Sequence, residues 1–551
     1  MITSSGRPLC IMGNVVDSQG RESVKTILVQ NGRISTIQTG KLPLSLPDVI
    51  LLELADDEVL FPGLINLHVH SEYNIFPLWQ SPAVWGNRYQ WRNNEQYLAE
   101  IKRFKEYIER SWVNDYLGFI RPIVQSLTAE KDEPLTPISI ASAVNEVQKL
   151  HGVITELQAV AGGTTLVQQT IKLENNASLP SFIVRNTGNP AELGLPSTRK
   201  VFSVVDFVKP GPDFDPSGSP LHATDDTAGW PMMRHPSFDD FLQSVQAGNN
   251  RYYASIAHIA EGRAGYLQRG KPDGFSRREF TEFRQALSQL AKAGLLKTAN
   301  LTLTHACGLD YSDPATLDFL RDNNISIVWS PVSNLILYRD TIPIKTVLDH
   351  GINVCLGSDW APSGSKHVWD ELKFARHFCD TLSLDVSDAH LLAMVTQNPA
   401  SALGQIKAGT IQTGYNADFF ILRKQSPQQS ALAALHTQDD HSVRCTIVNG
   451  RILYGDDDLF TNTLTVDYQR IPSDEGKAAA RKVVSINSAL KFDLTKALTQ
   501  VDSLMLRYAT ETLHLPQLRR TRLLSADDHV YQVRIKSVKS YLADLLKGLN
   551  K

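Results

Sequence analysis

The central part of the chain alternates between short apolar runs and longer stretches whose apolar residues recur at helical spacing. Short apolar runs bounded by turn residues are typical of buried strands, and apolar positions three and four apart are typical of amphipathic helices. The predicted strands are 58–70, 163–169, 181–186, 201–207, 252–260, 301–307, 325–331 and 352–359, and two clear helices between them are 276–295 and 315–324. Strand followed by helix, repeated about eight times, indicates an α/β fold, and we expect a (β/α)8 TIM-like barrel of parallel strands.

A doubly wound parallel sheet is the structural alternative to the barrel. That architecture often carries a glycine-rich fingerprint for a dinucleotide between its first strand and first helix. No such fingerprint follows any of the predicted strands. The barrel is therefore the preferred interpretation of residues 58–407.

Both flanks of this region change to short strands separated by turns. Asn31-Gly32 and Asn449-Gly450 each divide two apolar runs, which is the sequence signal of a tight β-hairpin. The surrounding residues are also alike, VQNGRI in the first flank and IVNGRI in the second. We expect one small β-sandwich domain assembled from residues 1–57 and 408–460.

Two further segments fit neither unit. Residues 71–158 are too long for one βα connection and begin with many aromatic side chains, among them Trp79, Trp85, Tyr89 and Trp91. An insertion after the first strand either lies over the barrel mouth as an apolar lid or covers the barrel side as ordinary core. Residues 461–551 form a C-terminal α-rich extension, with a helical pattern over 477–513 and strand followed by helix over 529–550.

Composition and charge narrow the class of protein. The chain has 551 residues, 42% of them hydrophobic and 8% aromatic, which excludes disorder on the scale of the whole chain. The formal net charge of −3 argues against a protein built to coat nucleic acid. Lysine and arginine outnumber acidic residues from Lys477 onward, but no nucleic-acid-binding motif accompanies them, so we expect a helical tail packed on an acidic body.

The five cysteines are few, odd in number and widely scattered, which excludes a disulfide scaffold and suits a reducing compartment. The N-terminus lacks the charged and apolar regions of a signal peptide, and no stretch reaches about 18 apolar residues without a charge. We therefore expect a cytoplasmic protein without membrane association. A homo-oligomer remains open.

The first predicted strand ends in His68-Val69-His70. Side chains two apart on a strand point the same way, so both imidazoles face one side. In a barrel they enter at the carboxyl-terminal mouth, where catalytic groups collect. Alone this pair is a weak signal, because two histidines so close recur by chance in long chains.

Three later predicted strands also end in groups that bind metals or protons, namely His258, His305 and Asp359. Burying an unpaired imidazole or carboxylate is costly, so their repeated placement at strand ends needs a reason. A divalent cation supplies one. Three imidazole nitrogens and one carboxylate, with a position left for water, form a catalytic rather than a structural metal shell.

With these motifs the sequence resembles the amidohydrolase superfamily. The resemblance rests on PGLINLHVHSE, GGTT, HIAEG, THACG, SPVSN and LGSDWAPSG in this order, and on the closing NPASALG, AGTIQTGYNADFFIL and VNGRILY. It covers about residues 8–456. The segment His258-Ile259-Ala260-Glu261 is similar to the HxxE motif of the branch that holds cytosine, guanine and adenosylhomocysteine deaminases and the triazine hydrolases.

The resemblance implies a role for each motif residue. The four ligands of one divalent metal ion would be His68, His70, His258 and Asp359. Glu261 would be the proton shuttle, His305 would orient the hydrolytic water or substrate, and Asp359 would also accept the proton of the water. Zinc is the preferred ion, with iron or manganese also suited to this ligand set.

Dinuclear members of the superfamily bridge two metals through a carbamylated lysine on the fourth strand. The fourth predicted strand here contains no lysine, and Lys209 falls just after it. One metal ion is therefore expected.

The expected activity is hydrolysis of carbon–nitrogen bonds other than peptide bonds, by metal-activated water acting on a small molecule. Deamination of a cyclic amidine or aromatic amine is the leading hypothesis. Ring-opening amide hydrolysis, as in an imidazolonepropionase, and release of halide remain open, because all three share the activated water. A non-catalytic metal-binding scaffold is the alternative from another class.

Overall fold

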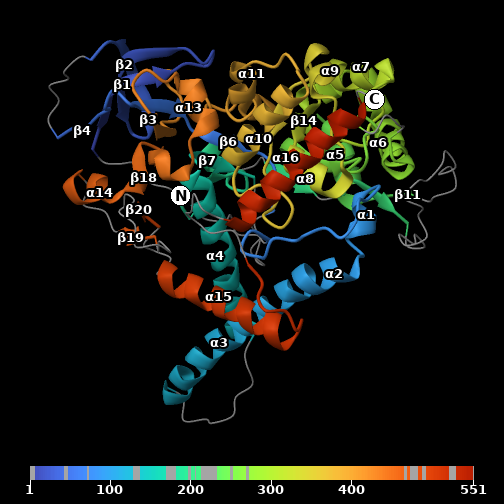
Figure 1. The fold of residues 1–551 in the computed structure, drawn as a ribbon, viewed down its shortest axis with the longest axis horizontal. Coiled ribbons are helices and arrows are strands. Elements are labelled where there is room, and N and C mark those ends of the chain that lie inside the picture. The colour runs from blue at the N-terminus through green and yellow to red at the C-terminus, as the bar shows by residue number, and fades with distance from the viewer. Residues whose placement is uncertain are drawn as a thin grey trace.

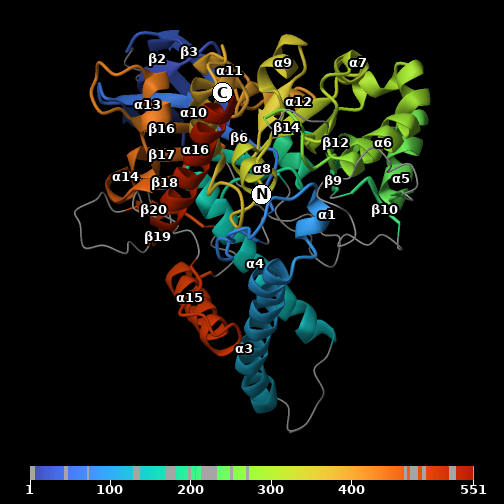
Figure 2. The same ribbon diagram turned by 45° about the vertical axis from the view of Figure 1, so that its right-hand side comes forward.

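The computed structural model shows an α/β molecule with two sheet systems and a pair of projecting helices (Figures 1 and 2). All residues predicted for the site lie within the part of the chain that it describes. This part comprises residues 7–41, 48–70, 73–127, 137–168, 182–196, 200–204, 206–211, 232–248, 252–267, 272–463, 468–471, 482–486, 492–519 and 529–549.

Strands from both flanks of the chain pair in one ten-stranded sheet, in the order β19-β20-β18-β17-β16-β5-β1-β2-β3, with β4 beside β1. The junction between the flanks is the antiparallel pair β5 and β16. A two-layer sandwich stays a prediction. The bounds of the strands are β1 Leu9–Val16, β2 Glu22–Gln30, β3 Arg33–Thr39, β4 Ile50–Glu53, β5 Glu58–Pro62, β16 Phe419–Arg423, β17 Val443–Val448, β18 Arg451–Asp456, β19 Gln469–Arg470 and β20 Lys482–Val484.

Both predicted hairpin turns are confirmed. Asn31 and Gly32 have φ of 50° and 73°, and Asn449 and Gly450 have φ of 54° and 74°. Positive φ at both central residues is what a two-residue type I′ turn requires. The two turns also meet, because Ala417 donates its backbone N–H to the carbonyl of Gly32 and accepts the N–H of Gly450.

Eight further strands are parallel to their neighbours. They form a three-stranded sheet in the order β6-β7-β8 and a five-stranded sheet in the order β15-β14-β13-β12-β9. A parallel bridge between Val69 and Asp359 connects the chain after β6 with the chain after β15. The bounds are β6 Leu64–Asn66, β7 Thr164–Val167, β8 Arg185–Asn186, β9 Lys200–Val204, β12 Tyr252–Ile259, β13 Leu301–His305, β14 Ser326–Trp329 and β15 Val354–Leu356.

Helices lie between the parallel strands, as the alternating pattern predicted. They bury amphipathic faces in one large core that includes the fully buried Trp329 and Trp369. Their bounds are α5 Pro236–Gln246, α6 Gly274–Lys292, α7 Pro314–Asp322, α8 Pro331–Tyr338, α9 Ile344–Asp349, α10 Val368–Thr381, α11 Asp388–Ala393 and α12 Gln397–Ala402. A small hairpin, β10 Val208–Pro210 and β11 Met232–Arg234, precedes α5, and α13 Ala431–Thr437 and α14 Asp457–Thr463 accompany the ten-stranded sheet.

The prediction of a single strand over residues 58–70 is wrong. The run divides at Gly63, where β5 joins the ten-stranded sheet and β6 joins the parallel strands. A Cβ at Gly63 would lie 2.2 Å from Oγ1 of Thr165, so only glycine fits this crossing. The run is apolar throughout because both halves are buried, each in a different sheet. His68 and His70 consequently follow the end of β6.

The insertion is mainly helical. After α1 Arg88–Trp91 and α2 Glu95–Tyr97, a π-helical turn over Leu98–Lys102 leads into α3 Arg103–Leu127, which pairs with α4 Pro137–Ala161. In both ribbon views α3 and α4 project from the body, with α15 Leu494–Glu511 beside α3 (Figures 1 and 2). Tyr508 of α15 donates a hydrogen bond to the carbonyl of Ala99.

Two predictions for the C-terminal extension are wrong. Residues 482–484, expected in a helix, form β20 and pair with β18, whereas 477–481 lie outside the described residues. The strand expected from residue 529 is part of one helix, α16 His529–Leu549, which packs against α8 and α10. Ile535, Val538 and Leu542 meet the core at helical spacing.

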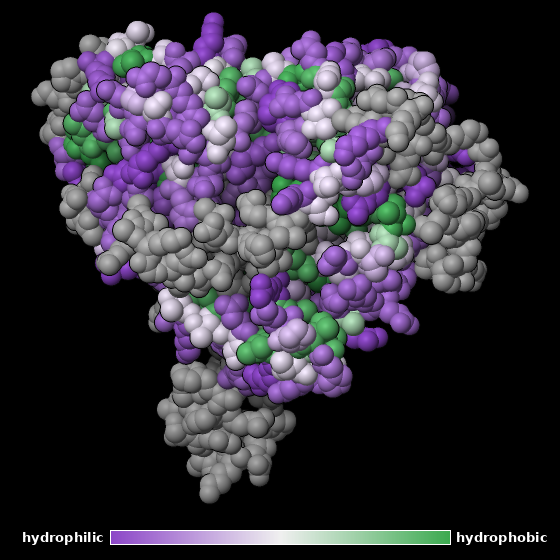
Figure 3. Space-filling model, in the orientation of Figure 1, coloured by the Kyte–Doolittle hydropathy of each residue, from purple (hydrophilic) through white to green (hydrophobic). Residues whose placement is uncertain are grey.

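The outer surface is mostly polar on the face shown in Figure 3, with small scattered apolar areas. Among the described residues, no helix combines the length and the apolar character that crossing a membrane requires. Short 3₁₀ segments occur at Pro190–Leu193, Leu295–Thr298 and Asp440–Ser442.

Candidate metal centre

The predicted ligands meet at the carboxyl ends of neighbouring parallel strands. His68 and His70 follow β6, and Asp359 follows β15, which the Val69 bridge brings alongside. His258 lies near the end of β12 and His305 ends β13. Residues separated by almost 300 positions are therefore neighbours because parallel strands present their carboxyl ends on one side.

The ligand atoms converge closely. Nε2 of His68 lies 3.1 Å from Oδ1 of Asp359, Nε2 of His70 lies 3.7 Å from the same oxygen, and Nε2 of His70 lies 3.3 Å from Nε2 of His258. Ligand atoms placed about 2.1 Å from a tetrahedral zinc ion are about 3.4 Å apart. The spacing of these four atoms thus fits a single small divalent cation.

Burial and mutual contacts shift the pKa values of these groups toward the protonation states that bind a cation. It lowers the pKa of His68 to about 4, despite the opposing effect of Asp359, and it also lowers the pKa of His258. Burial alone would raise the pKa of Asp359, but the hydrogen bond and charge of His68 lower it overall. Neutral imidazoles and an ionised carboxylate are the forms that bind metals. Nε2 of His68 is buried and faces the carboxylate oxygen Oδ1 of Asp359 at 3.1 Å.

Other buried side chains orient the ligands. Ser333 of α8 donates a hydrogen bond of 2.5 Å to Oδ2 of Asp359. The next residue, Asn334, places Oδ1 3.0 Å from Nδ1 of His305. Oε1 of Gln168, just after β7, accepts the backbone N–H of Val69 at 3.0 Å. Residues 330–334, the SPVSN motif, therefore begin helix α8, which holds two site residues.

The backbone is strained where the strands deliver these groups. Ala260, His305, Ala306 and Asp359 have φ between 51° and 62°. A residue with a Cβ pays about 1–3 kcal/mol for such a conformation, and it persists only where the surroundings enforce it. The Ala260 N–H donates to Oε2 of Glu279, and the Asp359 N–H donates to the carbonyl of His68. These bonds help hold the strained turns in place.

Glu261 lies beside the four converging groups. Its Oε2 is 3.9 Å from Nε2 of His305, and its Oε1 accepts a 2.7 Å hydrogen bond from the hydroxyl of Tyr338. A carboxylate oxygen of Glu261 and ring nitrogens of His258 and His305 lie within 4.8 Å of one another. The structure thus brings all six sequence-predicted residues together.

Arg88 is a site residue that the sequence did not indicate. It comes from the insertion, is 1% exposed, and forms ion pairs with Asp206 and with Glu279, the latter at 2.8 Å. Its Nη1 lies 3.8 Å from Oε2 of Glu261. Burial raises the pKa of Glu279 to about 8, although Arg88 opposes this shift. An arginine within a long aromatic insertion carries no sequence signal of such a contact.

The aromatic residues of the insertion are packed close to the site. Trp360, which follows Asp359, has its ring centroid 6.4 Å from that of His70 and 5.5 Å from that of Trp91. Tyr73 lies 5.0 Å from Trp360, and Trp79 is fully buried. The insertion is therefore ordinary core and also a wall over the carboxyl ends of the strands, which combines the two alternatives left open by the sequence.

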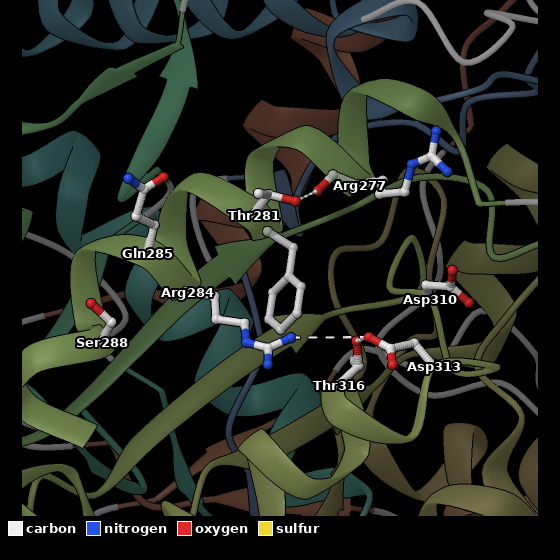
Figure 4. A pocket seen from close by; sticks show the side chains of 9 residues that line it. Arg277, Thr281, Arg284, Gln285, Ser288, Asp310, Asp313 and Thr316 are labelled. Carbon is white, nitrogen blue, oxygen red and sulfur yellow. Dashed lines mark hydrogen bonds and ion pairs between the residues drawn. The ribbon is translucent and has the colours of Figure 1, made fainter. Parts of the chain in front are cut away.

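A separate surface pocket of about 420 Å³ lies between α6 and the segment before and within α7 (Figure 4). Arg284 spans it to reach Asp313 at 4.0 Å. None of the six predicted site residues lines this pocket. It is distinct from the convergent histidines.

Known proteins resemble this chain in sequence and in fold. Residues 258–453 match the model of the amidohydrolase family. The chain is 34% identical over 181 residues to 5′-deoxyadenosine deaminase of Methanococcoides burtonii, which covers 31% of this chain and 41% of that protein. It is 31% identical over 170 residues to 5-methylthioadenosine/S-adenosylhomocysteine deaminase of Thermococcus onnurineus, covering 29% and 39%. The chain thus spans about two-fifths of the length of these curated relatives.

Solved structures share the fold over most of their length. An adenosine deaminase from Xanthomonas campestris with bound zinc is 16% identical, with a TM-score of 0.50 over 91% of this chain and 98% of that chain. Guanine deaminase from C. acetobutylicum is 15% identical, with a TM-score of 0.51 over 81% and 100%. Parallel strands with histidines and aspartate at their carboxyl ends define a class of metal-binding α/β proteins. Within that class, the sequence of residues 258–453 is similar to the amidohydrolase family.

Proposed function

We propose that this protein is a metal-dependent hydrolase that removes the amino group of an aminopurine nucleoside or a related small molecule. The observation that carries the proposal is the convergence of His68, His70, His258 and Asp359 beside the carboxylate of Glu261. The curated relatives named above are deaminases of adenine-containing compounds, which supports this class of substrate. The family also supports closure of the eight parallel strands into one barrel.

The assignment of roles is part of the proposal. Three histidine nitrogens and Asp359 would hold one divalent ion, and the neighbouring zinc-bound deaminase favours zinc. When bound, such a cation supplies Lewis acidity that makes water a stronger acid near neutral pH. Asp359 would accept a proton from the attacking water, because it is held as a carboxylate. Glu261 would carry the proton to the departing nitrogen, and His305 would orient the water or the substrate.

We also propose limits for the domains and a role in substrate binding for the aromatic residues of the insertion. Residues 63–407 would form the catalytic domain and residues 1–62 with 408–460 the β domain, because β5 lies in the ten-stranded sheet. Residues 461–551 would form the extension, whose strands β19 and β20 join that sheet. The aromatic wall formed by Trp91 and Trp360 suits a flat heteroaromatic ring, because aromatic rings pack well against one another. This supports an aminopurine over an extended aliphatic amide.

The test is a screen of purified protein with measured metal content. Adenosine, 5′-deoxyadenosine, 5-methylthioadenosine, S-adenosylhomocysteine and guanine would be offered, and released ammonia would be measured. Ring-opening or halide-releasing activity would consume its own substrates without this ammonia. His68→Ala should lose both bound metal and turnover, whereas the matched variant His350→Ala, on a histidine outside the site, should keep both. Full activity in a metal-free His68→Ala protein would overturn the proposal.

A further inference from the structure

We propose that the insertion orients the proton-carrying Glu261 through a chain of two hydrogen bonds, from Trp91 to Tyr338 and from Tyr338 to Glu261. Tyr338 and Trp91 would thus be positioning residues for the reaction. This inference rests on the proposed function, because it concerns which carboxylate oxygen of Glu261 carries the proton.

The direction of the two hydrogen bonds follows from the chemistry of the donors. Nε1 of Trp91 lies 2.9 Å from the hydroxyl oxygen of Tyr338, and an indole N–H can only donate. The hydroxyl oxygen therefore accepts from Trp91, and its own proton is directed to Oε1 of Glu261 at 2.7 Å. All three side chains are buried, so water does not compete for these bonds.

This arrangement distinguishes the two carboxylate oxygens of Glu261. Oε1 is occupied by the Tyr338 hydroxyl, whereas Oε2 faces His305 at 3.9 Å and Arg88 at 3.8 Å. Oε2 is thus the oxygen that faces His305, and we assign to it the uptake and release of the proton. Without Tyr338 the carboxyl group could rotate and present either oxygen.

The insertion also grips the backbone that carries Glu261. The N–H of Arg88 donates to the carbonyl of Glu261, and Asn87 forms an antiparallel bridge with Gly262. A Cβ at Gly262 would lie 2.6 Å from the carbonyl oxygen of Gly86, so this close approach requires glycine. Backbone and side chain of Glu261 are therefore held by the same short segment, residues 86–91.

Trp91 itself is held in place by its neighbours. Its ring lies 5.1 Å from Tyr97 and 5.5 Å from Trp360, and only 7% of the residue is exposed. The indole N–H therefore has little freedom to leave Tyr338.

The experiment compares Tyr338→Phe, Trp91→Phe and the double variant in the zinc-loaded full chain, with 5′-deoxyadenosine as probe. Tyr253→Phe is the matched control, because its hydroxyl donates to the carbonyl of Gly404 outside the site. We expect Tyr338→Phe to lower kcat about 10- to 100-fold, with KM within about threefold and zinc content unchanged. Trp91→Phe should lower kcat less, and the double variant should be no slower than Tyr338→Phe alone.

Two outcomes contradict the inference. One is a Tyr338→Phe enzyme with kcat within twofold of wild type, and the other is a double variant whose losses multiply, as independent packing defects would. If the wild type releases no ammonia from 5′-deoxyadenosine, the proposed substrate class fails while the positioning chain is still testable. In that case the thermal midpoints of Tyr338→Phe, Glu261→Ala and the double variant are compared with that of the wild type. If the two single-variant shifts in midpoint simply add up in the double variant, Tyr338 and Glu261 do not interact and the inference is wrong.

Discussion

The guanidinium of Arg88 lies 2.8 Å from the carboxylate of Glu279, and each side chain is 1% exposed. Removing one partner of such a pair leaves an uncompensated buried charge, which typically costs about 3–5 kcal/mol. Arg88→Met should therefore lower the free energy of unfolding by about this amount, measured by urea denaturation. Adding Glu279→Gln should restore part of the loss, since it removes an acidic group that would otherwise have to stay protonated without its arginine. Equal stability of Arg88→Met and wild type would show that the pair is not formed.

Glu156 of α4 should make stability depend on pH. Its Oε2 accepts the backbone N–H groups of Phe182, Ile183 and Val184, yet burial raises its pKa from 4.5 to about 8. The folded chain thus keeps a proton that the unfolded chain has released between these two values. Its contribution is complete below pH 4.5 and is lost as pH rises through about 8.

Glu156→Gln removes this titration. We expect the thermal midpoint of the variant, relative to wild type, to rise by several degrees between pH 5 and pH 9. Glu146→Gln on the same helix, where the side chain is partly exposed, is the control and should show no such trend. A difference between Glu156→Gln and wild type that is constant with pH would contradict the raised pKa.

Zinc should stabilise the fold through the proposed ligands. A ligand that binds only the folded state, at a free concentration of 100 times its Kd, adds about 2.7 kcal/mol to the free energy of unfolding. Protein stripped with a chelator should show this gain on titration with zinc, followed by its melting temperature. His68→Ala should show none of it. A similar gain in His68→Ala would place the zinc elsewhere in the molecule.

Ser333 should tune metal affinity without binding the metal. Its hydroxyl donates to Oδ2 of Asp359, and loss of a group that orients a metal ligand typically costs 10- to 100-fold in affinity or activity. We expect Ser333→Ala to weaken zinc binding by about this factor in competition with a chromophoric chelator. Ser326→Ala, a buried serine on β14, should bind zinc as the wild type does. Unchanged affinity in Ser333→Ala would remove Ser333 from the site.

Helix α16 should stabilise the part of the fold that holds the site. Leu542 is fully buried in the main core, and the hydroxyl of Tyr541 donates to the carbonyl of Arg339 at the end of α8. Leu542→Ala should cost about 2–5 kcal/mol of unfolding free energy, as for other buried leucines. Lys536→Ala on the exposed face of the same helix should cost little. A loss below about 1 kcal/mol in Leu542→Ala would mean that α16 contributes little.

The motif residues were predictable because each follows an apolar strand, and parallel strands bring their carboxyl ends together whatever lies between them. The position of His68, His258 and Asp359 at or just after the end of a strand was therefore enough to predict that they share one site. The hairpin turns at Asn31 and Asn449 were predictable for a similar local reason, since positive φ at two successive residues selects Asn-Gly.

The contacts of Arg88, Trp91 and Tyr338 could not be predicted in this way. Periodicity indicates which face of a helix is buried, but it does not indicate where a long insertion folds back onto a strand end. The division at Gly63 was hidden for another reason, because a continuous apolar run looks the same whether it serves one sheet or two. Near the start of α16 the apolar residues alternate with polar ones, which resembles the pattern of a strand. The segment is nevertheless helical, because its later apolar residues pack against the core at helical spacing.

Gly63 is the single residue between β5 of the ten-stranded sheet and β6 of the parallel strands, so it fixes the distance between the two. The N–H of Gly63 donates to the carbonyl of Asp418, and Leu64 pairs with the strand beside it, so neither side has slack. An added or deleted residue here would turn the following side chains to the opposite face and aim His68 and His70 away from the other ligands. A change of loop length should therefore be tolerated better at the more exposed turn between β1 and β2 than at this crossing.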